Sequence, residues 1–265
     1  MEALLAQLAP RPRDIAANAA RAATVIRQNP DVDLVVLPEL YLSGYTMERL
    51  DELACPAGGG ALAPVVDAAA SCGTAVVIGF PELIGGGVAN SVALIDRDGS
   101  LAGVYRKTHL FGDETRAFVQ GDSLLVATLA GRRVAPLVCF DIEFPEPARA
   151  AARAGAELLI TVSANMDPFW ADHELAGRAR ALENRLPHLY VNRVGSESGF
   201  DFVGGSRSIA PDGSVLVEAS SPTERLLAAS VALGQSTDDR VDYLRHARGE
   251  LPVLDVSAPA VATGD

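Results

Sequence analysis

Short apolar runs alternate with alanine-rich stretches along this chain, and that alternation restricts the fold more than any other feature of the sequence. The apolar runs predict buried strands, and the alanine-rich stretches predict helices. The predicted strands span Leu34–Leu37, Thr74–Phe80, Ser91–Ile95, Val134–Cys139, Leu158–Val162 and His188–Asn192. The predicted helices span Asp14–Gln28, Ala61–Ser71, Glu146–Ala154 and Ala171–Glu183. Strands and helices in alternation indicate the α/β class.

Two Asp-Gly turns interrupt this alternation in the same way. One lies between the apolar runs Val92–Asp96 and Leu101–Tyr105, and the other lies between Gly205–Ala210 and Val215–Glu218. Because Asp and Gly both tolerate positive φ, an Asp-Gly pair between apolar runs predicts a β-hairpin. Hairpins at corresponding places in the two halves indicate a duplicated layout around a mixed sheet, although no repeat in the sequence supports it.

A single domain is expected to account for almost the whole chain. The sequence has 265 residues, of which 49% are hydrophobic and only 5% aromatic, so a large core of small side chains can form. No linker rich in Gly, Ser or Pro divides it, which predicts one domain over residues 1–254. Residues 255–265 have a loose composition and are expected to form a C-terminal tail.

The charge and the cysteine content exclude several classes of protein. A formal net charge of −12 argues against binding to nucleic acid or to anionic membranes, because such binding needs a basic surface. The N-terminal segment does not resemble a signal peptide, and no run approaches the roughly 18 apolar residues of a membrane span. Three cysteines and four scattered histidines form neither a disulfide framework nor a metal-binding pattern. We therefore expect a cytoplasmic protein without a metal or cofactor.

Three reactive residue types follow directly after apolar runs. Glu39 follows LVVLP, Lys107 follows LAGVYR and Cys139 follows VAPLV. Side chains at the carboxyl ends of strands in α/β sheets converge where ligands bind. Taken singly, each has a simpler interpretation, because a cysteine here is often a buried hydrophobe and the two charges could belong to loops. Glu82, in GFPEL, has the same local sequence as Glu39 and competes with it.

Together these residues lie in three segments that resemble a known family. VLPELYLSGY, YRKTHLFGDE and VCFDIEFPE are similar, in order and approximate spacing, to the signature segments of the nitrilase superfamily of carbon–nitrogen hydrolases. SANMDPFW and ARALENR resemble later segments of that family, and the similarity extends from LLAQLAP to DYLRHAR. The resemblance implies a four-layer α-β-β-α sandwich assembled into homodimers or larger homo-oligomers. It also implies a catalytic triad of Glu39, Lys107 and Cys139, which leaves Glu82 a structural role.

The chemistry of amide cleavage explains this set of residue types. A thiolate is nucleophilic enough to attack an amide, a carboxylate accepts its proton, and a nearby ammonium lowers the pKa of the thiol. Lys107 and a backbone N–H after Cys139 would stabilise the oxyanion. Ammonia would leave with a proton from Glu39, which would then activate the water that hydrolyses the thioester.

Other residues near these segments have expected roles of their own. Glu114 in THLFGDE matches an additional Glu of similar family members and would orient Lys107 or the substrate amide; the alternative is an exposed loop acid. His109 and Phe111 are expected to hold that loop. Glu143 and Glu146 are expected to complement the positive end of the following helix dipole. The residues expected to line the substrate pocket are Phe140, Asn165, Met166, Phe169 and Trp170.

The residues after the cysteine favour one reaction among those of the family. True nitrilases tend to carry Cys-Trp-Glu, whereas Cys139-Phe140-Asp141 is closer to the amidase pattern Cys-Tyr-Asp. A primary-amide amidase is therefore the expected function, with a nitrilase or an N-carbamoyl amide hydrolase as alternatives and a catalytically silent binding subunit as a further one. Arg193 is a candidate for binding an anionic substrate, such as an ω-amide of a dicarboxylic acid.

Overall fold

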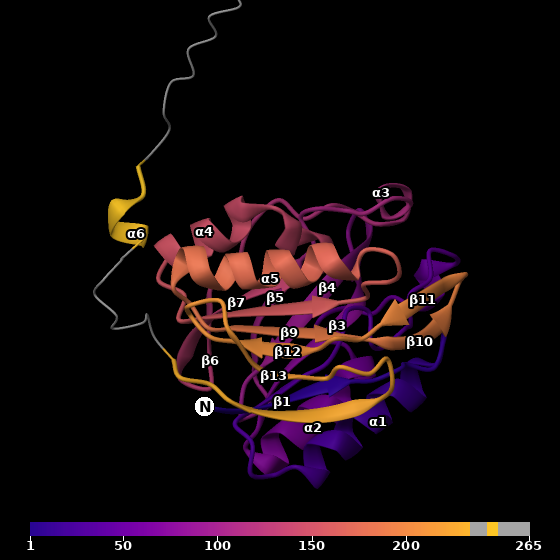
Figure 1. Ribbon diagram of the computed structural model, residues 1–265. Helices are drawn as coiled ribbons and strands as arrows, with labels where there is room; N and C mark the ends of the chain where they lie inside the picture. Colours follow the sequence, from indigo (N-terminus) through magenta and orange to yellow (C-terminus); the bar gives the residue numbers. More distant parts are fainter. Residues whose placement is uncertain (234–242, 249–265) are drawn as a thin grey trace, which may run out of the picture.

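The computed structural model describes residues 1–233 and 243–248, which form two six-stranded sheets flanked by helices (Figure 1). The expected tail, residues 255–265, lies outside the described residues. In the first sheet the strands lie in the order β14 (Arg225–Ser230), β1 (Glu2–Gln7), β2 (Leu34–Val36), β3 (Ala75–Ile84), β4 (Gly87–Ile95) and β5 (Leu101–Arg106). Strands β1, β2 and β3 are parallel, and the remaining neighbours pair antiparallel.

The second sheet repeats this layout with other parts of the chain. Its order is β13 (Val215–Glu218), β12 (Arg207–Ile209), β9 (His188–Asn192), β8 (Leu158–Ser163), β7 (Arg132–Val138) and β6 (Ala127–Leu129). Strands β7, β8 and β9 are parallel, β6 pairs antiparallel at one side, and the β12–β13 hairpin does so at the other. Each sheet thus has three parallel strands between antiparallel neighbours, which confirms the duplicated layout and both predicted hairpins.

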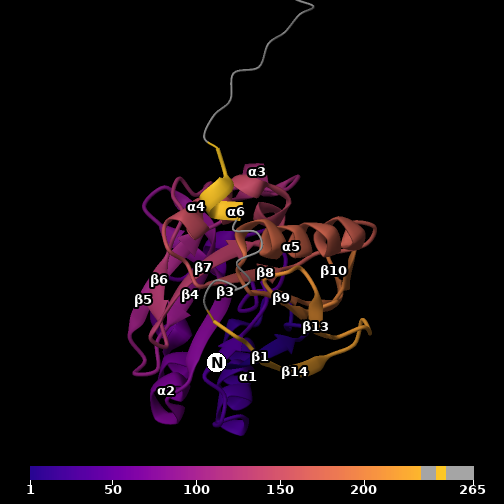
Figure 2. The ribbon, with the colours of Figure 1, turned by 60° about the vertical axis from the view of Figure 1, so that its left-hand side comes forward.

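Helices cover the outer faces of the two sheets. Helices α1 (Ile15–Gln28) and α2 (Ala63–Cys72) lie on the first sheet, and α4 (Pro145–Arg153) and α5 (Trp170–Asn184) lie on the second (Figures 1 and 2). The smaller elements are α3 (Glu114–Ala117), the β10–β11 ribbon (Val194–Glu197 and Phe200–Val203) and α6 (Tyr243–His246). The predicted four-layer α-β-β-α sandwich is therefore confirmed.

Alternating side chains of the strands explain why the layers hold together. Leu34 and Val36 of β2 face the second sheet, where they join a core with Ile160 and Val162 of β8, whereas Val35 packs toward α1 and α2. A parallel strand that is buried on both faces reads as a continuous apolar run. This is the reason that the apolar runs locate the central strands so well.

One strand contradicts its local sequence preference. The segment EALLAQ consists largely of good helix formers, yet it forms β1 between β14 and β2. Pairing with strands from both ends of the chain outweighs that preference.

None of the described helices is both long enough and apolar enough to cross a membrane.

Candidate active site

The three reactive residues predicted at strand ends lie together at one end of the two sheets. Glu39 follows β2, Lys107 follows β5, and Cys139 follows β7 directly. The Nζ of Lys107 donates to Oε1 of Glu39 at 2.8 Å, and neither side chain has any exposed surface. The Glu39 carboxylate and the Lys107 ammonium both act electrostatically on the Cys139 thiol. Because Glu39 and Lys107 follow strands of the first sheet and Cys139 follows a strand of the second, both sheets contribute to one site.

The Glu39 carboxylate is held by three donors. Its Oε1 accepts from Lys107 and, at 2.7 Å, from the Nδ2 of Asn90, while its Oε2 accepts from the backbone N–H of Ala164 at 2.7 Å. Ala164 directly follows β8 of the second sheet. Because a buried carboxylate is costly unless it is hydrogen-bonded, these donors stabilise Glu39 in a fixed position.

Glu114 completes a buried cluster with Glu39 and Lys107. Its carboxylate lies 2.8 Å from Lys107 Nζ, and it also accepts from the Tyr45 hydroxyl at 2.9 Å and the Phe111 N–H at 2.8 Å. The alternative of an exposed loop acid is therefore wrong. Burial disfavours the Lys107 ammonium, but Glu114 and Glu39 outweigh it and hold the pKa of Lys107 well above its ordinary value. Burial also raises the pKa of Glu114.

Cys139 occupies a strained turn at the end of β7. Its φ is +45°, in the left-handed region that non-glycine residues seldom adopt, and the chain then turns through a 3-10 segment, Cys139–Glu143. Burial, followed by the negative charge of Glu39, raises the pKa of its thiol, while Lys107 and a hydrogen bond from Ser163 lower it. The resting sulfur is thus a thiol that needs a base before it can attack.

Asp141 ties this turn to the loop that carries Lys107. Its Oδ1 accepts from the Thr108 hydroxyl and the His109 N–H, both at 2.8 Å, and its Oδ2 accepts from the Tyr105 hydroxyl at 2.8 Å and the Val138 N–H at 3.0 Å. His109 also stacks on Phe144 with the ring centroids 4.1 Å apart. These contacts agree with the expected role of His109 in holding the loop.

A glycine brings the Glu39 segment close to β3. A Cβ added at Gly79 would lie 2.5 Å from both Leu40 N and Pro38 O, so a larger side chain cannot be accommodated without a backbone shift. The Gly79 N–H donates to Pro38 O at 3.2 Å, and its carbonyl accepts from Leu42 N at 3.2 Å. Gly79 therefore allows the backbone around Glu39 to be fixed to the sheet.

A narrow, largely apolar pocket opens at Cys139. It is lined by Tyr45, Phe111, Cys139, Phe140, Glu143, Asn165, Met166, Phe169 and His173, and its free volume is about 10 Å³. The ring of Phe111 meets those of Phe140 and Phe169 edge-on, with centroids 5.4 and 5.5 Å apart. A volume of this size holds about one water molecule, so the aromatic rings restrict what can reach the sulfur.

The comparison with known proteins agrees with this geometry. A model of the carbon–nitrogen hydrolase family matches residues 3–240 of the chain. The chain belongs to the carbon–nitrogen hydrolase family. Similarity to amidases of the nitrilase superfamily places this hydrolase in that superfamily, as its three sequence segments predicted.

Several relatives of this carbon–nitrogen hydrolase are named for their reactions. An (R)-stereoselective amidase from Pseudomonas sp. is 42% identical over 222 residues, which cover 83% of this chain and 81% of the relative. A 2-oxoglutaramate amidase from Bacillus subtilis is 33% identical over 81% of this chain and 83% of its own. A nitrilase-superfamily amidase from Nesterenkonia AN1 has a TM-score of 0.82 at 30% identity, with 94% of both chains covered. In another structure of that amidase, the acetamide moiety of fluoroacetamide is covalently attached to the active-site cysteine.

Most of the pocket residues predicted for this hydrolase line the pocket at Cys139, but Trp170 does not. Phe140, Asn165, Met166 and Phe169 are among the lining residues. The side chain of Trp170, the first residue of α5, is 51% exposed and faces a different hollow. Trp170 therefore does not line the pocket at Cys139, and its contact with the substrate stays a prediction.

Glu143 and Arg193 of the hydrolase do not lie where the sequence suggested, whereas Glu146 and Glu82 do. Glu146 lies in the first turn of α4 as predicted, but Glu143 precedes the helix and lines the pocket instead. Arg193 is buried with its guanidinium 2.6 Å from Glu197 and 4.0 Å above the Phe202 ring, and it does not line the pocket. Glu82 binds Arg106 at 2.7 and 2.9 Å, apart from the Lys107 cluster, in agreement with its structural role.

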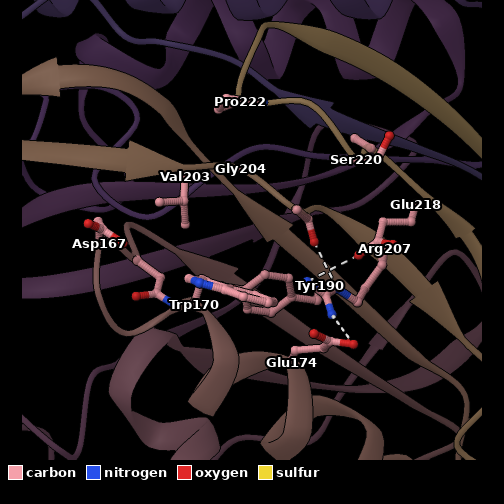
Figure 3. A pocket seen from close by; sticks show the side chains of 13 residues that line it. Asp167, Trp170, Glu174, Tyr190, Val203, Gly204, Arg207, Glu218, Ser220 and Pro222 are labelled. Carbon is pink, nitrogen blue, oxygen red and sulfur yellow. Dashed lines mark hydrogen bonds and ion pairs between the residues drawn. The ribbon is translucent and has the colours of Figure 1, made fainter.

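The hollow that Trp170 faces is larger and more polar. Its volume is about 470 Å³, and Arg207 lies at its wall between Glu174 and Glu218, over the ring of Tyr190 (Figure 3). Cys139 and the Glu39–Lys107–Glu114 cluster are not among the residues that line it. Size alone therefore does not mark the candidate active site, since the predicted catalytic cysteine lines the smaller pocket.

Several site residues have no counterpart in the sequence predictions. Asn90 and Tyr45 bind the two carboxylates, Asp141 joins two loops, and Ser163 contacts Cys139. Asn90 and Ser163 carry a recognisable signal, because each is a polar residue in or next to an apolar strand. Buried polar residues need partners, and in both cases the partners belong to the site. Within the described residues, no group of three His, Cys, Asp or Glu side chains is arranged to hold a metal ion.

Proposed function

We propose that this hydrolase is an amidase that converts small uncharged primary amides to a carboxylic acid and ammonia through a thioester on Cys139. The observation that carries the proposal is the buried Glu39–Lys107–Glu114 cluster that acts on Cys139 beside a narrow pocket. Relatives named as amidases support the reaction class.

In the first half of the proposed reaction, Glu39 accepts the Cys139 proton as the sulfur attacks the amide carbon. A base is needed there because burial and the charge of Glu39 raise the pKa of the thiol. The developing oxyanion is stabilised by the Lys107 ammonium and the N–H of Phe140. One such donor typically contributes about 3–4 kcal/mol to the transition state. Glu39 then returns the proton to the departing ammonia.

In the second half, Glu39 activates a water molecule that attacks the thioester, and the acid and the Cys139 thiol are released. Glu114 takes no proton in this scheme. Its carboxylate already accepts from Lys107, Tyr45 and Phe111, which supports a positioning role toward the Lys107 ammonium. An ammonium fixed between two carboxylates needs little reorganisation as the oxyanion forms.

The walls of the pocket support the substrate class. Five of its lining residues are aromatic or methionine, and its free volume is about 10 Å³. Among the described residues that line it, none is Arg or Lys, whereas Glu143 contributes a carboxylate. A substrate carboxylate would therefore lose hydration without gaining a counter-ion. This disfavours ω-amides of dicarboxylic acids, for which Arg193 had been a candidate.

A comparison of amides of equal length tests the substrate class. Purified protein should release ammonia from butyramide with a kcat/KM at least tenfold above that for succinamate, its carboxylate-bearing counterpart. The reason is the missing counter-ion at the acyl side of the pocket. Faster turnover of succinamate would overturn the assignment of uncharged substrates, and no ammonia from any amide would overturn the amidase itself.

The alternative functions are separated by one matched pair of substrates. Butyramide should be turned over far faster than butyronitrile, because Cys139-Phe140-Asp141 resembles the amidase pattern. A Glu39→Gln variant should show no burst of ammonia, since the proposed proton carrier acts in both halves of the reaction. Faster acid formation from the nitrile would favour a nitrilase, and faster cleavage of a carbamoyl amino acid would favour an N-carbamoyl amide hydrolase.

A further inference from the structure

A line of polar side chains runs from the pocket wall to the end of β8, next to Cys139. The Nε2 of His173 lies 3.3 Å from Oε1 of Glu143, and its Nδ1 lies 2.9 Å from the Tyr190 hydroxyl. That hydroxyl donates to Ser163 Oγ at 3.2 Å. Ser163 is the last residue of β8 and lies beside Cys139, because Val162 of β8 pairs with Val138 of β7, the residue before Cys139. His173, Tyr190 and Ser163 are all buried.

The direction of each hydrogen bond follows from the partners of Ser163. Its Oγ accepts from the N–H of Asn165 at 3.1 Å and from the Tyr190 hydroxyl. A hydroxyl has one hydrogen and two lone pairs, so both acceptor positions are filled and the hydrogen is left to donate. Toward Cys139, Ser163 therefore acts as a donor, and its bond lowers the pKa of that thiol.

The same reasoning fixes the outer part of the line. Because the Tyr190 hydroxyl donates to Ser163, it accepts from an N–H at Nδ1 of His173. The carboxylate of Glu143 lies 3.3 Å from the other ring nitrogen, at the outer end of the line. The bonds from His173 through Tyr190 to Ser163 then all point toward Cys139.

We propose that Ser163, Tyr190 and His173 form a donor chain that stabilises negative charge on the Cys139 sulfur, with Glu143 holding its outer end. These residues are positioning residues, and the proposal rests on Cys139 being the nucleophile. The charged groups that act on Cys139 are Glu39, Lys107 and Glu114, of which only Lys107 favours a thiolate. The donor chain supplies a second stabilising contact to the sulfur.

Charged groups also lie near the donor chain. Arg207 acts on the Tyr190 phenol and lies 5.7 Å from the centre of its ring, and Glu143 lies 3.3 Å from His173. Asp172 and Glu174 flank His173 along α5 itself. The outer end of the donor chain lies at the pocket, where a bound substrate would contact Glu143 and His173.

Alkylation of the full-length protein by iodoacetamide tests the proposal without requiring amide turnover. In Tyr190→Phe, the logarithm of the Cys139 alkylation rate plotted against pH should keep its slope but move by about one unit to higher pH. The rate at a given pH should thus fall about tenfold. Mass mapping of the labelled peptide identifies Cys139 as the alkylated residue. Tyr41→Phe is the matched control, because the Tyr41 hydroxyl is buried and has no hydrogen-bond partner.

Ser163→Ala should produce the same shift, and Ser163→Thr, which keeps the hydroxyl, should restore it. If Tyr190→Phe does not fold, the smaller change Ser163→Ala tests the donor chain. Unchanged alkylation in folded Ser163→Ala or Tyr190→Phe would overturn the donor chain, as would an equal shift in Tyr41→Phe. Failure of the proposed amidase would instead show as normal alkylation shifts without any ammonia release in the wild-type protein.

Discussion

At the scale of single residues, the three cysteines have different neighbours. The Cys139 thiol lies within electrostatic reach of Glu39, Lys107 and Glu114, whereas Cys55 faces Glu82, and burial raises the pKa of Cys55 to about 11. Cys139→Ala should abolish ammonia release while circular dichroism stays unchanged, because Cys139 is the proposed nucleophile and the Lys107 ammonium, the proposed oxyanion donor, acts on its thiol. Cys55→Ala and Cys72→Ala are the controls, and loss of activity in either folded control would contradict the assignment.

Lys107 is expected to act through position as well as charge. Its Nζ lies 2.8 Å from two carboxylates, and a longer, planar guanidinium cannot occupy that point. Lys107→Arg should therefore lose at least about 10² in kcat, the typical loss for one oxyanion donor. The neighbouring Arg106→Lys is the matched reverse exchange and should retain activity. Near wild-type turnover in Lys107→Arg would assign the oxyanion to another group.

At the scale of elements, the position of Glu39 depends on how closely the segment after β2 approaches β3. The Cβ of an alanine at Gly79 would meet Leu40 N and Pro38 O at 2.5 Å, and both are backbone atoms that cannot rotate away. Gly79→Ala should cost about 1–3 kcal/mol in unfolding free energy and reduce kcat by roughly 10², because Glu39 is displaced. Gly58→Ala is the control, since nothing lies within 4 Å of its added Cβ. Wild-type kcat in Gly79→Ala would show that the segment tolerates the shift.

At the scale of the whole molecule, His188 couples folding to pH. It lies fully buried in β9, 2.8 Å from the Thr161 hydroxyl and 3.1 Å from the Gly177 carbonyl, and burial lowers its pKa from 6.5 to about 4. Between pH 6.5 and 4, the unfolded chain therefore binds a proton that the folded chain does not. Stability should fall as the pH falls through this window, by roughly 3 kcal/mol at its lower end.

Urea denaturation at pH 7, 5.5 and 4.5 measures this coupling. His188→Gln should reduce the loss of stability over that range, because the group that takes up the proton is absent. His246→Gln, at an exposed histidine of α6, should leave the pH dependence unchanged. An unchanged pH dependence in His188→Gln would assign the acid sensitivity to other groups.

Assembly also belongs to this scale. A homodimer or larger homo-oligomer stays a prediction from the family resemblance. The exposed side chains of Leu175 and Leu182 lie seven residues apart on α5, where they stand on one face of the helix. Sedimentation of the wild-type protein and of Leu175→Lys measures the assembly. A monomeric wild type would contradict the prediction.

The sequence by itself determined the class of fold and the central strands, and it predicted the reactive residues. Runs such as Leu158–Val162 are apolar throughout because the strand is buried on both faces, and this leaves a signal that needs no structure to interpret. The proximity of Glu39, Lys107 and Cys139 could be predicted because strand ends converge and because their segments resemble those of a family. The hairpins could be predicted because the conformation of an Asp-Gly turn depends on the turn residues alone.

Only the tertiary structure decided which side chains meet. Local sequence left open whether Glu114 is a solvated acid, and its contacts with Lys107 and with Tyr45, which lies 69 residues away, settle its burial. Local sequence also predicted Glu143 at a helix start, because a motif gives the order of residues but not the direction of each side chain. The donor chain from His173 to Ser163 joins α5, β9 and β8 through contacts that span 17 and 27 residues of sequence. Such contacts depend on the packing of elements, which no local pattern encodes.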